Sequence, residues 1–112
     1  MSSTVGEGGF LYSIYGADQD LQDVVALFVE EMSDRIECLV AQSQSRDWVQ
    51  LGRTAHAIKG AAGTYGFDQF TPVAHRLELL AREGRPEAEI LQSVEALIDL
   101  CRRVRPGKAG DS

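Results

Sequence analysis

The stretch DWVQLGRTAHAIKGAAGTYG, residues 47–66, decides the fold of this 112-residue chain. Asp47, followed by Gln50 three positions later, is typical of a capping box at the start of a helix. The spacing of three and four that follows marks one face of an α-helix, and that face holds Leu51, Ala55, Ile58, Ala62 and Tyr65. The stretch therefore predicts an amphipathic helix that starts at Asp47, ends near Gly63 or Tyr65 and buries one side.

The same apolar spacing predicts three further helices elsewhere in the chain. Asp18 or Asp20 is the expected cap of the first, and Thr71 before Pro72 is the favoured start of the third long helix. Pro86 opens the last helix in its first turn. The first helix is expected at about 20–41. The third long helix is expected to start within 68–72 and to end near 84, and the last helix is expected to run from 86 to just before 106.

Short connectors between four amphipathic helices make neighbours antiparallel, so we predict an all-α, up-down four-helix bundle. A short helix or turn is expected at Phe10–Tyr15, closed by Gly16, and we assign it as a short extra N-terminal helix of the bundle. No segment shows strict alternation of apolar and polar residues, so no sheet is expected. We expect one domain at 10–105, with a flexible N-terminus at 1–9 and a flexible C-terminus at 106–112.

Composition and charge narrow the class of function. The chain is 44% hydrophobic and 25% charged, as a soluble globular domain is. Its formal net charge of −6 argues against nucleic acid as a partner, since phosphate binding requires Lys and Arg. No apolar run approaches the roughly 18–20 residues that span a bilayer, and the N-terminus lacks the features of a signal peptide. We therefore predict a cytoplasmic protein without a membrane segment.

Two cysteines and two histidines are the remaining residues with distinctive chemistry. Cys38 and Cys101 lie far apart in the sequence, which favours two buried or half-buried thiols in a reducing compartment while leaving a disulfide open. His56 and His75 lack an ordered set of further ligands, so no metal site is predicted.

His56 lies about 120° from the middle of the apolar face of its helix, so we expect it to point outward. Gly52, Gly60 and Gly63 stand on the same outward strip. Each glycine inside a helix costs about 1 kcal/mol relative to alanine, and close approach by another molecule would explain that cost. Helix ends offer another explanation for Gly63 and Gly52, but not for Gly60.

The run Ala55–Gly66, AHAIKGAAGTYG, closely resembles the signature of histidine-containing phosphotransfer domains. That signature is a histidine, any residue, an aliphatic residue, lysine, glycine, two small residues and a further glycine. The resemblance implies that His56 is the phosphorylated histidine, that Lys59 lies beside it and stabilises the phosphoryl group, and that Gly60 keeps the ring accessible. Such families often place a glutamine on the next helix near the imidazole, whereas the matching region here holds His75 and Glu78.

The resemblance implies a phosphorelay carrier of two-component signalling rather than an enzyme. His56 would accept a phosphoryl group from a receiver-domain aspartate and pass it to another. The expected partners are response-regulator receiver domains and/or a hybrid sensor histidine kinase. No cofactor of its own is expected, because the receiver domain supplies Mg²⁺. The chain contains no GxxxxGK[ST] loop with which to bind ATP.

We expect docking on the solvent sides of the first two long helices around His56, with Gly52, Arg53, Gly60 and Gly63 in the contact. Arg53 is also placed to help Lys59 pair with the phosphoryl group. Two alternatives remain open at this point. One is an adaptor bundle that binds a receiver or kinase without being phosphorylated, and the other is an interaction bundle in which the histidine has no role.

Overall fold

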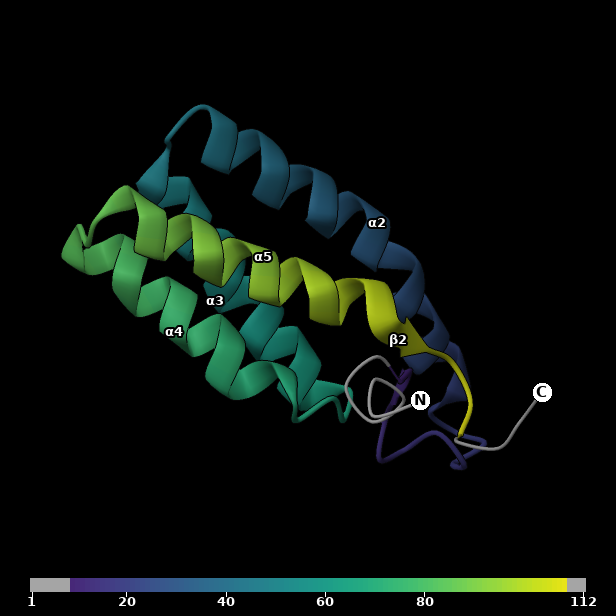
Figure 1. Cartoon of the computed structure of the whole chain (residues 1–112). Coiled ribbons are helices and arrows are strands. Elements are labelled where there is room, and N and C mark those ends of the chain that lie inside the picture. The colour runs from purple at the N-terminus through teal and green to yellow at the C-terminus, as the bar shows by residue number, and fades with distance from the viewer. Residues whose placement is uncertain (1–8, 109–112) are drawn as a thin grey trace, which may run out of the picture.

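The computed structural model describes residues 9–108. Helix α3 packs against α2 and α4, and α5 packs against the same two helices, so the four surround one core (Figure 1). This confirms the predicted four-helix bundle. The connectors 45–47, 65–69 and 84–86 are short, which favours the up-down antiparallel order that we predicted. The helices are α2 (Gln22–Gln44), α3 (Trp48–Thr64), α4 (Phe70–Glu83) and α5 (Glu87–Arg103).

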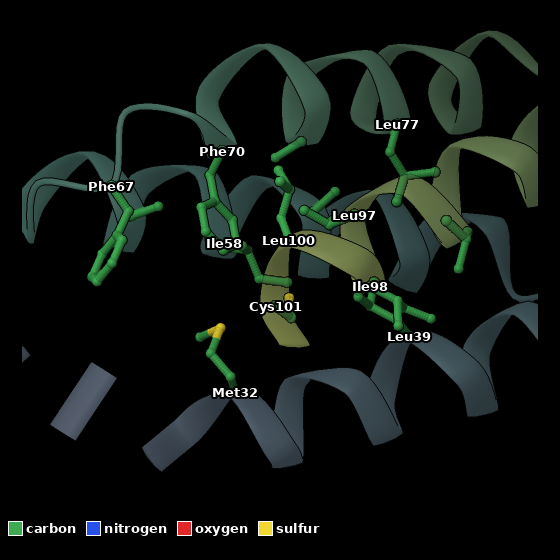
Figure 2. Packing of buried hydrophobic residues seen from close by; sticks show 14 of the residues in the cluster. Met32, Leu39, Ile58, Phe67, Phe70, Leu77, Leu97, Ile98, Leu100 and Cys101 are labelled. Atoms are coloured by element: carbon green, nitrogen blue, oxygen red, sulfur yellow. The ribbon is translucent and has the colours of Figure 1, made fainter. Parts of the chain in front are cut away.

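The apolar faces of the four helices meet in the core. Phe28 of α2 stacks on Phe67 with ring centroids 4.9 Å apart, and it meets Phe70 edge-on at 5.9 Å. Figure 2 shows side chains of α2, α3, α4 and α5 converging on the same interior. The predicted apolar face of α3 is buried. Four of its five residues are fully buried: Leu51, Ala55, Ile58 and Ala62.

Helix α3 begins where the sequence predicts. The Asp47 carboxylate Oδ1 accepts a hydrogen bond from the Gln50 backbone N–H at 3.2 Å. The helix ends at Thr64, within the expected range. Helix α4 ends at Glu83, and the capping residue Gly84 has a φ of 65°, the left-handed conformation that glycine adopts most easily.

Two predicted helix caps are wrong. Leu21 precedes α2, and Asp18 Oδ1 instead accepts a bond from the Asp20 backbone N–H at 2.9 Å in a local turn. The pair Thr71–Pro72 lies inside α4 rather than at its start, because the helix begins at Phe70. Phe70 is fully buried, so starting the helix there adds a large aromatic residue to its apolar face.

The N-terminal segment is not the short helix that we predicted at Phe10–Tyr15. Strand β1 (Leu11–Tyr12) pairs in parallel with strand β2 (Val104–Arg105), so the expectation of no sheet is also wrong. Leu11 and Val104 are buried opposite each other in this pair. A helix of six residues forms too few internal hydrogen bonds to offset its nucleation cost, whereas pairing with the other end of the chain buries Leu11.

The residues after β1 are tied to the end of α3. The Ser13 hydroxyl donates to the Tyr65 carbonyl, and the Ile14 backbone N–H donates to the Gly66 carbonyl at 2.9 Å. Gly66 has φ 84°, and a Cβ there would lie 2.5 Å from Ser13 Oγ. The turn after α3 therefore needs glycine for both its conformation and its space.

Both cysteines are free thiols, as predicted. Cys101 is buried, but Cys38 is exposed, so the expected burial is wrong for Cys38. Burial raises the pKa of the Cys101 thiol to about 12. Within residues 9–108, no helix combines the length and the apolar character needed to cross a bilayer. The predicted flexible ends at 1–9 and 106–112 fall mostly outside the described residues.

Replacing Asp47 by alanine is expected to lower the free energy of unfolding by about 1 kcal/mol, the usual effect of losing a helix cap. Urea denaturation of the two proteins measures this difference. Asp20→Ala is the matched control, because the Asp20 carboxylate caps no helix, and it is expected to change the value by less than about 0.5 kcal/mol. Equal losses in the two variants would contradict the cap assignment.

Candidate functional site

His56 lies on the outward side of α3. Its side chain is 67% exposed, although the neighbouring core residues Ala55 and Ile58 are fully buried. The helical spacing separates these positions, because residues next to each other in a helix point about 100° apart. The prediction that the imidazole is displayed to solvent is confirmed.

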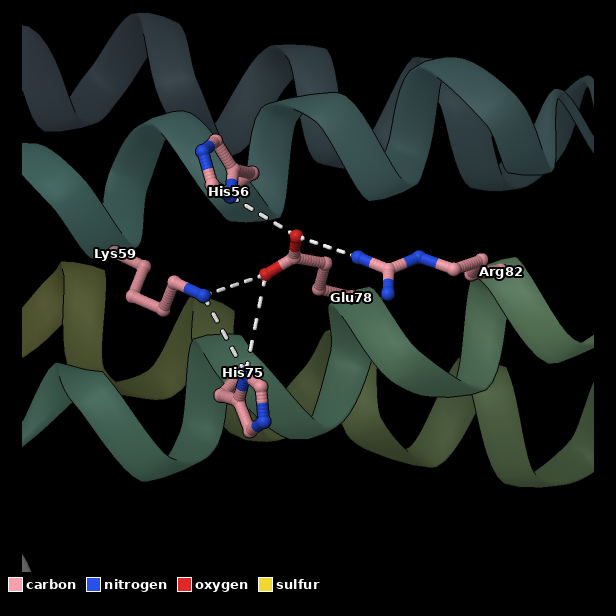
Figure 3. Close-up of polar contacts among 5 residues, drawn as sticks. All are labelled: His56, Lys59, His75, Glu78 and Arg82. Atoms are coloured by element: carbon pink, nitrogen blue, oxygen red, sulfur yellow. Dashed lines mark hydrogen bonds and ion pairs between the residues drawn. The ribbon is translucent and has the colours of Figure 1, made fainter.

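Glu78 of α4 contacts the histidine and two cations (Figure 3). Its Oε2 lies 2.9 Å from His56 Nδ1 and 2.9 Å from an Arg82 guanidinium nitrogen. Its Oε1 accepts a hydrogen bond from Lys59 Nζ at 2.7 Å. The Glu78 side chain is only 10% exposed, so the carboxylate is a nearly buried charge whose oxygens are satisfied by partners on α3 and α4.

These contacts keep Glu78 ionised at neutral pH. The Lys59 ammonium, through its hydrogen bond, holds the pKa of the Glu78 carboxyl below its ordinary value; burial opposes this shift, and the bond with His56 adds to it. An ionised carboxylate can only accept hydrogen bonds. His56 Nδ1 therefore carries the proton and donates it to Oε2, which leaves the lone pair of the neutral ring on Nε2. In Figure 3 that second nitrogen points away from Glu78.

Lys59 is held between Glu78 and His75. Its Nζ donates to His75 Nδ1 at 3.3 Å as well as to Glu78, and its side chain is 24% exposed. Since an ammonium has no acceptor, His75 Nδ1 must be the acceptor in this contact. Glu78 balances the positive charge of Lys59, so Lys59 repels a positive charge on the His56 ring less than an unpaired ammonium would.

The four residues that we assigned to docking fall into two groups. Gly60 and Gly63 are exposed, and a Cβ at either position would meet no atom within 4 Å. Gly52 is half-buried instead, and its Cβ would lie 3.6 Å from the Ala81 Cβ of α4. Arg53 is exposed next to Gly52. The open strip next to His56 therefore runs toward the C-terminal end of α3, whereas Gly52 belongs to the contact with α4.

Glu78 and Arg82 are the site residues to which the sequence analysis gave no role. Glu78 stands at a buried position of α4, four residues after Ala74 and three before Ala81, both of which are buried. A charged residue on an apolar helix face requires a charged partner, and that was a signal available in the sequence. The identity of the partners depends on how α3 and α4 pack. Arg82 is 65% exposed, and its spacing of four from Glu78 was the corresponding clue.

The described part of the chain contains no group of three or more histidine, cysteine, aspartate or glutamate side chains suited to holding a metal ion. The polar cluster at α3 and α4 instead pairs one carboxylate with His56, Lys59 and Arg82. Its chemistry is that of a solvent-facing nitrogen nucleophile whose other ring nitrogen is held by an anion.

A comparison with protein-family models agrees with this geometry. The model of the Hpt domain matches residues 23–106, which is most of the chain. This chain belongs to the Hpt domain family. The match includes α3 with His56 and Lys59, and α4 with Glu78. Among solved structures, none gives a significant match to the chain. Hpt domains are phosphotransfer carriers of two-component signalling and are not kinases, so the family and the exposed imidazole indicate the same class of function.

Proposed function

We propose that this Hpt domain is a phosphorelay carrier of the cytoplasm, which accepts a phosphoryl group on His56 from a receiver-domain aspartate and passes it to another receiver. One observation supports this proposal above the others. The His56 ring is 67% exposed, its Nδ1–H is bonded to Glu78, and its Nε2 lone pair is left for reaction. A structural histidine would direct both nitrogens to partners within the protein.

The transfer forms one bond and breaks another. The Nε2 lone pair attacks phosphorus in line with the P–O bond to the partner's aspartate, and that bond breaks to release the carboxylate. Mg²⁺ on the receiver would neutralise charge on the phosphoryl oxygens. As Nε2 bonds to phosphorus the ring gains positive charge, and Glu78 stabilises that charge through the Nδ1–H···Oε2 bond.

Lys59 supports the phosphorylated state in this proposal. The phosphoryl group on His56 carries a charge near −2 at neutral pH. Lys59 lies one helical turn from His56 and keeps one of its three donors for such a group when it bonds Glu78 and His75. Arg53, three residues before His56 on the same helix, is exposed and adds a second cation nearby.

The test uses wild-type protein incubated with phosphoramidate, a small phosphoryl donor, and separately with phosphorylated receiver domains. We expect an acid-labile, base-stable label that mass spectrometry places on His56. His56→Gln is expected to abolish the label, and His75→Gln, the matched control on the neighbouring helix, is expected to retain it.

The outcomes separate the carrier from the alternatives. A label on His75 or no label with either donor would overturn the proposal. Receiver binding without any label would instead support the adaptor. The label must also leave His56 when the purified phosphoprotein meets an unphosphorylated receiver, since a carrier has to release what it accepts.

A further inference from the structure

A groove of about 460 Å³ lies between α3 and α4 next to the proposed phosphorylation site. His56 and Glu78 themselves line it, so any side chain that enters the groove comes against the reacting imidazole. The remaining lining residues come from the first part of α3 and the last part of α4: Trp48, Val49, Gly52, Arg53, Ala81 and Arg82.

Part of the groove lining is apolar. Val49 is 66% exposed there, so its side chain is accessible to a partner. Trp48 is partly buried and packs against the core. Gly52 keeps the groove open, because a side chain there would extend toward Ala81 from a Cβ only 3.6 Å from the Ala81 Cβ. An aliphatic or aromatic side chain of another protein therefore fits this part of the lining better than a polar one does.

The rim of the groove is positively charged. Arg53 is exposed, and the Arg82 side chain is 65% exposed although one of its nitrogens bonds Glu78. A guanidinium has five N–H donors, so Arg82 keeps donors for a second carboxylate. The opposite charge lies on α2, whose exposed residues include Asp23, Glu30, Glu31, Asp34 and Glu37.

We propose that this groove is the docking site of the receiver domain, which inserts an apolar side chain between α3 and α4 and pairs carboxylates with Arg53 and Arg82. The inference rests on the proposed function and adds the surface and the chemistry of the partner. An aspartyl-phosphate site is anionic, because it presents the phosphoryl group together with the carboxylates that hold Mg²⁺. The basic rim attracts such a surface and the acidic side of α2 repels it.

This orientation differs from the expectation of docking on the solvent sides of the first two long helices. The receiver lies over α3 and α4, and α2 remains outside the main contact. Gly60 and Gly63 still leave the ring uncovered from the other side of His56, so the reacting groups meet at the edge of the docked surface.

The test compares two exposed aliphatic residues that receive the same new charge. Val49→Asp places a carboxylate in the groove, whereas Leu27→Asp places one on the solvent side of α2, where Leu27 is 53% exposed. The measurement is KM and kcat for phosphoryl transfer from each phosphorylated receiver of the source organism. The rate of phosphorylation by phosphoramidate measures the reactivity of His56 itself. For each variant, the rate with a receiver is divided by the rate with phosphoramidate, so that a change in docking is separated from a change in reactivity.

We expect Val49→Asp to raise KM about tenfold, because a carboxylate replaces an apolar contact and repels the partner. Leu27→Asp is expected to keep the wild-type KM. Arg53→Glu should raise KM by at least as much as Val49→Asp, while Arg102→Glu, an exposed arginine of α5, should not.

Three results would overturn the inference. A higher KM for Leu27→Asp than for Val49→Asp would place the receiver on α2. An unchanged KM for both Val49→Asp and Arg53→Glu would show that the groove is not used. Labelling of His56 by phosphoramidate without transfer from any receiver would reject the receiver as the partner and leave the phosphorylation site intact. Loss of both reactions, by contrast, would reject the proposed function itself.

Discussion

Gly60→Arg is expected to reduce phosphorylation of His56 by a receiver at least about 100-fold while the bundle stays folded. Gly60 is exposed one helical turn after His56, and a side chain there meets open space. The arginine therefore fits the folded protein, and leaving glycine gains up to about 1 kcal/mol of helix stability. Its long side chain stands next to the ring that the receiver must approach, and small displacements of reacting atoms lower transfer rates by about 100-fold.

Gly60→Ala is the matched control for this variant. A single methyl group should leave at least about half of the receiver-driven rate, because it does not extend to the ring. Circular dichroism and urea denaturation check that both variants are folded. Normal exchange by Gly60→Arg would show that the glycine strip is not an approach surface.

Glu78→Ala is expected to lower the rate of phosphorylation by phosphoramidate roughly 10-fold to 100-fold, the effect of removing a group that orients a reactive histidine. The variant removes the acceptor of the Nδ1 proton, so the neutral ring also populates the form with its proton on Nε2, which is not nucleophilic there. Nitrogen-15 NMR of the imidazole measures the two ring forms directly. Glu78→Gln is the matched control, because its amide oxygen can still accept the Nδ1 proton.

The same variant makes a prediction about stability and pH. The pKa of Glu78 is lower in the folded protein than in the unfolded chain, so its ionised form stabilises the fold at pH values above the ordinary carboxyl pKa of about 4.3. That contribution is lost as the pH falls through the folded-state pKa. The difference in unfolding free energy between wild type and Glu78→Ala should therefore be present at about pH 5 and shrink as the pH falls below about 4. A difference that grows as the pH falls below about 4 would contradict the assigned ion pairs.

Helix α3 was predictable because its bounds and its exposed face depend on neighbouring residues. Asp47 caps the helix locally, and the spacing of Leu51, Ala55 and Ile58 decides that His56 points outward. The strand at Leu11–Tyr12 was not predictable in the same way, since its partner lies at the other end of the chain. Local propensity contains no information about such a pairing.

The amino-acid sequence alone determined the four helices, the exposure of His56 and the uncovered strip next to it, because helical periodicity and the order of residues 55–66 are local properties. Only the tertiary structure decided what holds the His56 imidazole. Glu78 is twenty-two residues from His56 in the chain, and the packing of α4 against α3 brings its carboxylate to Nδ1 and, with Lys59 and Arg82, makes a nearly buried charge stable. The groove at the same helix contact exists for the same reason: two helices must pack before a surface between them can form.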